Sequence, residues 1–274
     1  MKATLTLLMV LQLSVPALSY RSEAAELAKT NLPMQGESFL VADSTAFIIP
    51  GKKAADAADK PKPWVWYAPT LPNLPGNEER WMFEQFCDSG IAIAGIDAGE
   101  SYGSPAGGKV FTAFYAEMAG QRGYAKRPVL LGRSRGGLMT LSWAAENPAQ
   151  VAAFAGIYPV CNLASYPGID QAAGAYELNP DQLRARLEDY NPIDRLAPLA
   201  RARIPLFAIH GDVDALVPLA ANSGLMKDRY EALDGTMTLL VPPGQGHSMW
   251  SGFFQCQELV DFVKTHALSP AHGQ

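Results

Sequence analysis

Short apolar runs and longer mixed segments alternate along most of this chain. The apolar runs have the length and β-prone composition of buried strands, and strands are predicted at residues 64–68, 91–97, 128–131, 151–158, 205–209 and 236–241. Helices are predicted between and after them, at residues 78–89, 110–121, 137–146, 180–189, 219–233 and 252–266. This alternation predicts a mostly parallel central sheet with helices on both faces, in which functional groups gather beyond the carboxyl ends of the strands.

Two stretches differ from this alternation. Residues 37–49 hold β-prone residues interrupted by Ala42-Asp43-Ser44, which predicts a hairpin of two strands. Residues 162–200 are rich in Asn, Asp, Pro and Tyr, and we expect them to form a short cap insertion over the sheet face. Because there is no internal repeat and no linker, residues 37–268 are predicted to form one domain, between an N-terminal segment (20–36) and a C-terminal tail (269–274).

The first residues have the pattern of a signal peptide. A positive charge at Lys2 precedes an apolar stretch over residues 5–15, which ends in Pro16-Ala17-Leu18-Ser19, with small residues where a signal peptidase requires them. A transmembrane anchor is the alternative, but the stretch is short for a bilayer. We therefore expect residues 1–19 to be a signal peptide, the mature protein to be secreted or periplasmic, and no stable membrane insertion.

Composition limits the kinds of function. The chain has 274 residues, of which 48% are hydrophobic, and this is enough for one large domain with a substantial core. A net charge of −5 with scattered Lys and Arg offers no basic surface, so nucleic acid is not expected as a partner. The three cysteines lack metal-ligand spacing, and no metal or organic cofactor is expected. Cys161 and Cys256 both fall near the expected functional face, which leaves a disulfide between them open.

The candidate chemistry centres on the stretch Gly132-Arg133-Ser134-Arg135-Gly136. A predicted buried strand precedes this G-x-S-x-G pattern and a predicted helix follows it, and that context is typical of a nucleophile elbow. The glycines let strand and helix approach closely, and the serine hydroxyl stands exposed beside a helix N-terminus, where an anion is favoured. Ser134 is therefore the candidate nucleophile.

A serine hydroxyl needs a base to accept its proton, and histidine is the commonest one. Of the four histidines, His247 follows the last predicted strand in a loop of small residues, whereas His210, at a strand end, has the position of a structural residue. The base in turn needs a carboxylate to orient it, and both Asp212 and Asp214 follow the strand 205–209. His247 is thus the candidate base, with two aspartates competing as its partner.

These motifs resemble those of the α/β-hydrolase superfamily over residues 37–267, and the resemblance implies an α/β-hydrolase fold. The stretch from His210 to Pro218 matches the superfamily's acid loop, which selects Asp214 as the acid and leaves Asp212 to support the turn. The order of nucleophile, acid and base along the chain is also that of the superfamily.

The resemblance also implies two backbone donors for an oxyanion. One is the N–H of Arg135, the residue after the nucleophile. The other comes from the loop after the strand 64–68, where Pro69-Thr70 stands in place of the usual His-Gly and the following Leu71 would donate its N–H. Leu71 is the predicted second donor, and Thr70 is the neighbour to test.

The two arginines of the elbow bear on the substrate. Ser-Arg-x-Gly is similar to glucuronoyl esterases, and the resemblance implies that the arginine after the nucleophile helps to hold the oxyanion. Arg133 and Arg135 could together bind a carboxylate or a polyol, or they could pair with nearby acids such as Asp97 or Glu100.

The motifs together predict an exported serine hydrolase that cleaves a carboxylic ester, with a small molecule or a carbohydrate ester as substrate. Tyr102 and Trp250 lie beside loops that carry the chemistry and are expected to bind substrate together with Arg133. The segment 191–196 is similar to the prolyl-oligopeptidase and acetyl-esterase branch, so a peptidase of the prolyl-oligopeptidase type is an alternative. A second alternative is a non-catalytic binding protein on the same fold.

Overall fold

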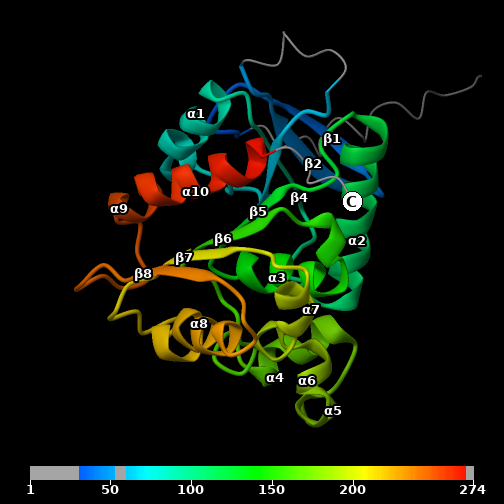
Figure 1. Ribbon diagram of the computed structural model, residues 1–274. Coiled ribbons are helices and arrows are strands. Elements are labelled where there is room, and N and C mark those ends of the chain that lie inside the picture. The colour runs from blue at the N-terminus through cyan, green and yellow to red at the C-terminus, as the bar shows by residue number, and fades with distance from the viewer. Residues whose placement is uncertain (1–30, 53–59, 270–274) are drawn as a thin grey trace, which may run out of the picture.

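The computed structural model describes residues 31–52 and 60–269 (Figure 1). The predicted signal peptide lies outside the described residues, as do most of the N-terminal segment and of the C-terminal tail. Within the described ranges, no helix combines the length and the apolar character needed to cross a membrane.

The strands form one sheet in the order β1-β2-β4-β3-β5-β6-β7-β8. β1 and β2 make the predicted antiparallel hairpin, and β2 runs antiparallel to β4. The pairs β4–β3, β3–β5, β5–β6, β6–β7 and β7–β8 are parallel. The predicted, mostly parallel sheet is therefore confirmed. Its strands are β1 (Glu37–Val41), β2 (Ser44–Ile49), β3 (Trp64–Ala68), β4 (Ala92–Ile96), β5 (Val129–Arg133), β6 (Ala153–Ile157), β7 (Leu206–Ile209) and β8 (Met237–Leu240).

Helices cover both faces of the sheet, as the sequence predicts (Figure 1). Side chains alternate along each strand, so Trp64 and Trp66 of β3 pack against one set of helices and Val65 and Tyr67 against the other. The first set is α2 (Pro105–Tyr115), α3 (Gly136–Glu146), α7 (Ala197–Arg201) and α8 (Ser223–Glu231), and the second is α1 (Arg80–Asp88), α9 (Ser251–Phe254) and α10 (Gln257–Leu268).

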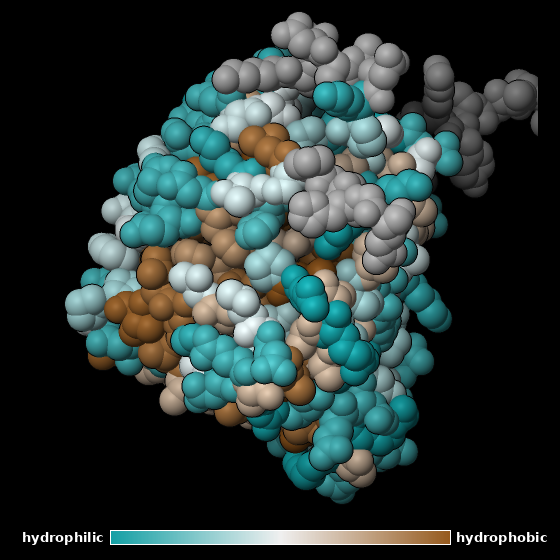
Figure 2. Space-filling model, viewed as in Figure 1, coloured by the Kyte–Doolittle hydropathy of each residue, from teal (hydrophilic) through white to brown (hydrophobic). Residues whose placement is uncertain are grey.

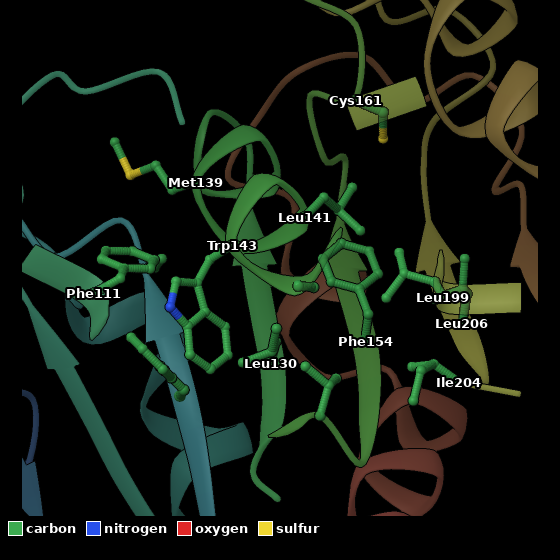
Figure 3. Close-up of a cluster of buried hydrophobic side chains, with 14 of the residues drawn as sticks. Phe111, Leu130, Met139, Leu141, Trp143, Phe154, Cys161, Leu199, Ile204 and Leu206 are labelled. Carbon is green, nitrogen blue, oxygen red and sulfur yellow. The ribbon is translucent and has the colours of Figure 1, made fainter. Parts of the chain in front are cut away.

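Helix α3, which follows the candidate elbow, is buried on all sides. Ten consecutive residues, from Gly136 to Ala145, are buried, and Trp143 lies between Phe111 of α2 and Leu130 of β5 (Figure 3). A Cβ atom on Gly136 would lie 2.0 Å from the carbonyl oxygen of Ala68, so only glycine allows this approach. The start of the helix is thereby held against the end of β3.

Residues 162–200 form a group of short helices beside α3 and α8 (Figure 1). Apolar side chains of this cap pack against Tyr102 and against Leu138 in the first turn of α3. The helix predicted over residues 180–189 is divided in two, because Arg186 has φ −121 and interrupts the helical backbone. The cap helices are α4 (Ile169–Ala172), α5 (Pro180–Ala185) and α6 (Leu187–Tyr190).

Helix α2 begins earlier than predicted. Its first residue is Pro105, and the Ser104 hydroxyl accepts a hydrogen bond from the Gly107 N–H at 3.4 Å. Serine before a helix and proline in its first position are both favourable, because they satisfy or replace unpaired N–H groups. The sequence carried this start signal, which the loop-like composition of the stretch had masked.

The disulfide that the sequence left open is not formed. Cys161 packs in the cluster of the α2 and α3 face, while Cys256 packs in the cluster of the α1 and α10 face, on the other side of the sheet. All three cysteines are free and buried. Burial raises the pKa of the Cys87 thiol to about 11, so this thiol stays protonated.

Candidate active site

Ser134 lies in a strained turn between β5 and α3. Its φ is +51, in the left-handed region that non-glycine residues rarely adopt. The surrounding chain fixes this conformation, because the Ser134 N–H donates to the carbonyl of Ile157 at 3.0 Å and its carbonyl accepts from the N–H of Val160 at 2.8 Å. Neighbouring strand β6 and the loop after it therefore hold the elbow from the side.

The structure brings His247 and Asp214 to this serine. His247 Nε2 lies 3.0 Å from Ser134 Oγ, and His247 Nδ1 lies 2.8 Å from Asp214 Oδ2. Because the carboxylate accepts the proton on Nδ1, Nε2 is free to accept the serine proton. The three residues lie in loops after β5, β7 and β8, at one edge of the sheet.

The two aspartates that compete as the partner of His247 have different surroundings. Asp214 is buried, and its Oδ1 accepts hydrogen bonds from the N–H groups of Leu216 and Val217 at 3.0 and 2.8 Å. Asp212 is exposed and accepts from the N–H of Gly244 at 2.6 Å, which joins the acid loop to the loop that carries the histidine. Asp212 thus supports the loops and does not contact His247.

His210 is a buried structural neighbour of the acid. Its Nε2 donates to the Val217 carbonyl at 2.8 Å and lies 3.4 Å from Asp214 Oδ2, and its Nδ1 lies 2.8 Å from Ser223 Oγ. Burial lowers the pKa of the His210 imidazole, although the Val217 carbonyl and Asp214 act in the opposite direction. We take His210 to be a neutral donor that helps to fix the acid.

The loop after β3 offers a different donor from the one predicted. The Leu71 N–H donates to the Leu74 carbonyl at 3.1 Å, so it is already used within the loop. In the described part of the chain, neither the Thr70 N–H nor the Arg135 N–H has a protein acceptor, and Thr70 Oγ1 is buried without a partner. This hydroxyl lies against Gly95 of β4, on the side of β3 away from Ser134. Leu71 is therefore not free to act as the predicted second donor, and the Thr70 N–H is the candidate donor in its place.

The predicted substrate-binding residues differ in their surroundings. Arg133 is buried and pairs with Glu79, whereas Arg135 is partly exposed and pairs with Glu100 at 2.9 Å. Glu100 was one of the acids anticipated as a partner from the sequence, and Glu79 was not. Burial of Arg133 is incompatible with direct contact to substrate, which corrects that prediction.

The two aromatic residues that were predicted to bind substrate, Tyr102 and Trp250, also differ in their exposure. Tyr102 is buried beneath the cap, where its hydroxyl accepts from Gln171 and its carbonyl from the Tyr176 hydroxyl. Tyr102 therefore supports the cap, and its burial does not fit the predicted contact with substrate. Trp250 is 39% exposed in the loop that carries His247.

Apolar side chains gather near the candidate base. Val213, Leu216, Met249 and Trp250 are exposed large hydrophobic residues of the acid loop and of the loop after β8. Figure 2 shows hydrophobic surface at the edge of the molecule where these loops lie. Such a patch beside a reactive group suits the apolar part of a substrate.

One residue of this site, Tyr158, was given no specific role by the sequence. The Tyr158 ring lies 4.3 Å from the His247 ring, centroid to centroid, and φ at Tyr158 is +35. Its place at the end of a buried strand, directly before Pro159, was the available signal. In the described residues, no group of three or more His, Cys, Asp or Glu side chains is arranged to hold a metal ion.

This topology, with a serine on a strained elbow and a histidine and an aspartate beyond later strands, defines an α/β-hydrolase. A model of the prolyl oligopeptidase family matches residues 111–267, which is more than half of the chain. The chain therefore belongs to the prolyl oligopeptidase family of serine hydrolases. No curated protein matches the sequence.

Solved structures with similar folds differ in how much of them this chain covers. A puromycin-hydrolyzing peptidase of Mycobacterium tuberculosis has a TM-score of 0.67 and 15% identity over 87% of this chain, which spans 40% of that protein. Est1E from Butyrivibrio proteoclasticus has a TM-score of 0.62 and 17% identity, covering 86% of this chain and 100% of its own. An S-formylglutathione hydrolase from Agrobacterium tumefaciens has a TM-score of 0.62 and 17% identity, covering 85% and 99%. At these identities the likeness is one of fold.

Proposed function

We propose that this chain is an exported serine hydrolase that cleaves a carboxylic ester. The observation that carries the proposal is the hydrogen-bonded series from Ser134 Oγ to His247 Nε2 at 3.0 Å and from His247 Nδ1 to Asp214 Oδ2 at 2.8 Å. Export rests on the signal-peptide pattern of residues 1–19 alone. N-terminal sequencing of the mature protein from a secreting host should begin at Tyr20, and an uncleaved Met1 would contradict export.

The geometry suits an acyl-enzyme mechanism. Ser134 Oγ attacks the acyl carbon while its proton moves to His247 Nε2, and the tetrahedral intermediate then expels the alcohol, which takes that proton. Water attacks the resulting acyl-enzyme and gives its proton to His247, after which the acid leaves and the serine is restored. Asp214 holds the imidazole in the required tautomer and stabilises the imidazolium.

The N–H groups of Arg135 and Thr70 are the proposed oxyanion donors. Both lie beside the elbow, because Gly136 contacts the Ala68–Pro69 peptide directly before Thr70. Each N–H is free of protein acceptors among the described residues and can therefore donate to developing negative charge.

The substrate is proposed to be a small-molecule or carbohydrate ester. Trp250 and its exposed apolar neighbours can hold the non-polar part of the ester. The Arg135 side chain is 30% exposed, and its guanidinium can exchange its contact with Glu100 for a carboxylate or hydroxyl of the substrate.

A peptidase is the second candidate, because the family model and several structural neighbours carry that name. Turnover of p-nitrophenyl acetate should be compared with turnover of aminoacyl-proline p-nitroanilides. Hydrolysis of the ester with little action on the amides supports our proposal. Preference for the amides would favour the peptidase.

Covalent labelling tests the hydrolase site itself. A fluorophosphonate probe should label the wild-type protein, and Ser134→Ala should abolish both labelling and ester turnover. Ser142→Ala is a matched control, since this serine is buried in α3, away from the elbow. A wild type that neither reacts with the probe nor hydrolyses any ester would instead indicate a binding protein on the same fold.

A further inference from the structure

Arg133 is buried on the face of the sheet that α9 and α10 cover. Alternation along β5 places it on the same side as Val129 and Leu131, which belong to the cluster of that face. The centre of its guanidinium lies 5.0 Å from the ring of Phe254 in α9. With a side chain that is only 5% exposed, Arg133 needs partners within the protein.

Each nitrogen of the guanidinium has a different partner. Nη1 donates to Glu79 Oε1 at 2.5 Å, Nε donates to the Tyr158 hydroxyl at 3.2 Å, and Nη2 contacts Met249 Sδ at 2.8 Å. Burial alone would lower the pKa of Arg133, but the nearby Tyr67 and Glu79 outweigh it and the pKa is raised. The guanidinium is therefore a fixed cation that joins three separate segments of the chain.

Glu79 is fully buried and is itself held in place. Its Oε1 also accepts from the Tyr67 hydroxyl at 2.7 Å, and its Oε2 accepts from the Gly76 N–H at 2.8 Å. The carboxylate thus anchors Arg133 to a rigid part of the core, between β3 and α1.

The other two partners of Arg133 both bear on His247. The Tyr158 ring packs against the imidazole, with 4.3 Å between centroids, and the edge of Phe253 supports that ring at 5.0 Å. Met249 lies two residues after His247 in the same loop. One guanidinium therefore contacts the ring on which the base rests and the segment that carries the base.

The loop around His247 has little burial of its own to hold it. Ser248, Met249 and Trp250 are exposed, and the Met249 side chain contacts the core through its sulfur atom on Arg133. A loop with few buried contacts opens easily unless particular interactions hold it. The contact of Met249 with a fixed cation supplies such an interaction.

We propose that Arg133 is a positioning residue for His247, and that the buried Glu79–Arg133 pair keeps the base loop in register with Ser134. This inference rests on the proposed function, because it assigns to the pair a role in proton transfer from the serine. Arg133 does not touch substrate. It acts by fixing the Tyr158 hydroxyl and the Met249 sulfur, which together limit the positions open to the imidazole.

The test compares the second-order rate constant for fluorophosphonate labelling with ester kcat and KM, at a temperature where every variant is folded. Arg133→Lys keeps the charge but cannot make three directed contacts, and Tyr158→Phe keeps the ring but removes one of them. Both should lower the labelling rate and kcat about tenfold or more with KM within about twofold, because a small misplacement of a base acts on the chemical step.

Tyr67→Phe is the matched control. It removes a buried hydrogen bond to the same Glu79 carboxylate but leaves the contacts of Arg133 with Glu79, Tyr158 and Met249 in place. It should lower the melting temperature about as much as Tyr158→Phe does, while labelling stays within about twofold of wild type. Should Arg133→Lys fail to fold, Tyr158→Phe and Met249→Leu carry the test.

Two outcomes overturn the positioning role alone. Labelling of Tyr158→Phe at the wild-type rate would show that the contact does not position the base, as would an equal loss in Tyr67→Phe. Absence of labelling in the wild type would instead overturn the proposed function and this role with it. A labelled wild type with unaffected variants leaves the proposed function standing and removes only this inference.

Discussion

Arg133 and Arg135 stand on either side of Ser134, and the fold gives them opposite surroundings. Arg133 ends β5 with a side chain that is 5% exposed, and its partner Glu79 is 0% exposed. Arg135 lies at the start of α3 with a side chain that is 30% exposed, and its partner Glu100 is 44% exposed. One ion pair is enclosed behind the nucleophile and the other lies at the surface beside it.

One residue type can thus serve two purposes at neighbouring positions. A buried pair has no solvent to replace a lost partner, so it holds its surroundings in one arrangement. An exposed pair is worth little by itself and can be exchanged for a substrate group at low cost. We therefore assign positioning to the Arg133 pair and recognition to Arg135.

The two arginines should differ most in what they contribute to stability. Arg133→Met leaves Glu79 buried without its cation, and we expect the free energy of unfolding to fall by about 3–5 kcal/mol. Arg135→Met should change it by less than about 1 kcal/mol. Urea denaturation of both variants gives the comparison, and similar losses in the two would remove the distinction between them. Adding Glu79→Gln to Arg133→Met should restore part of the loss.

The next effect concerns substrate choice. Arg135→Gln should lower the ratio of kcat/KM for an ester with a neighbouring carboxylate to that for a neutral ester by about tenfold, because one charge-assisted contact contributes about 1.4 kcal/mol. Methyl esters of a uronic acid and of its neutral analogue supply the pair of substrates. An unchanged ratio would mean that Glu100 retains the guanidinium during catalysis.

A smaller effect is expected at Thr70, where a buried hydroxyl has no partner among the described residues. Thr70→Val removes this hydroxyl, keeps the shape and leaves the backbone N–H in place. Stability should rise by about 1 kcal/mol, since an unpaired buried polar group is lost, and kcat should change less than about twofold. A fall in kcat of about a hundredfold would instead make the hydroxyl the oxyanion donor.

The smallest expected effect is the pH dependence of stability due to His210. Burial lowers its pKa in the folded state below the ordinary value of 6.5. As pH falls through 6.5, the unfolded chain binds a proton that the folded one does not, so stability declines until the folded-state pKa is reached. Between pH 7.5 and 5.5 the wild type should lose up to about 1 kcal/mol more than His210→Gln in urea denaturation. Equal losses would show that His210 already binds the proton when folded.

Much of the fold was predictable because its signals are local. The apolar runs gave the strands close to their observed bounds, and the turn at Ala42 and Asp43 has the positive φ values of a hairpin connection. The start of α2 was predicted five residues too late, and the division of the cap helix into α5 and α6 was not predicted. There, the hydroxyl cap of Ser104 and the backbone at Arg186 overrode what composition suggested.

The candidate triad was also predictable, since strand ends of a parallel sheet converge and the three residues follow such ends. The second oxyanion donor was not, because whether an N–H is free depends on a contact such as that between Leu71 and Leu74. Glu79 and Tyr158 were likewise invisible as partners of Arg133, which they reach from distant parts of the chain.

Strand periodicity and turn chemistry act between near neighbours, so the sheet, the elbow with Ser134 and the order in which acid and base follow it can be predicted from the sequence alone. The roles of the two arginines depend on the folded structure. Both are equally basic in the sequence. Arg133 is a buried cation because η2 (Asn77–Glu79), β6 and the loop after β8 pack around it, whereas Arg135 remains partly exposed. Burial and partners arise from contacts between distant segments, and these appear only when the chain is folded.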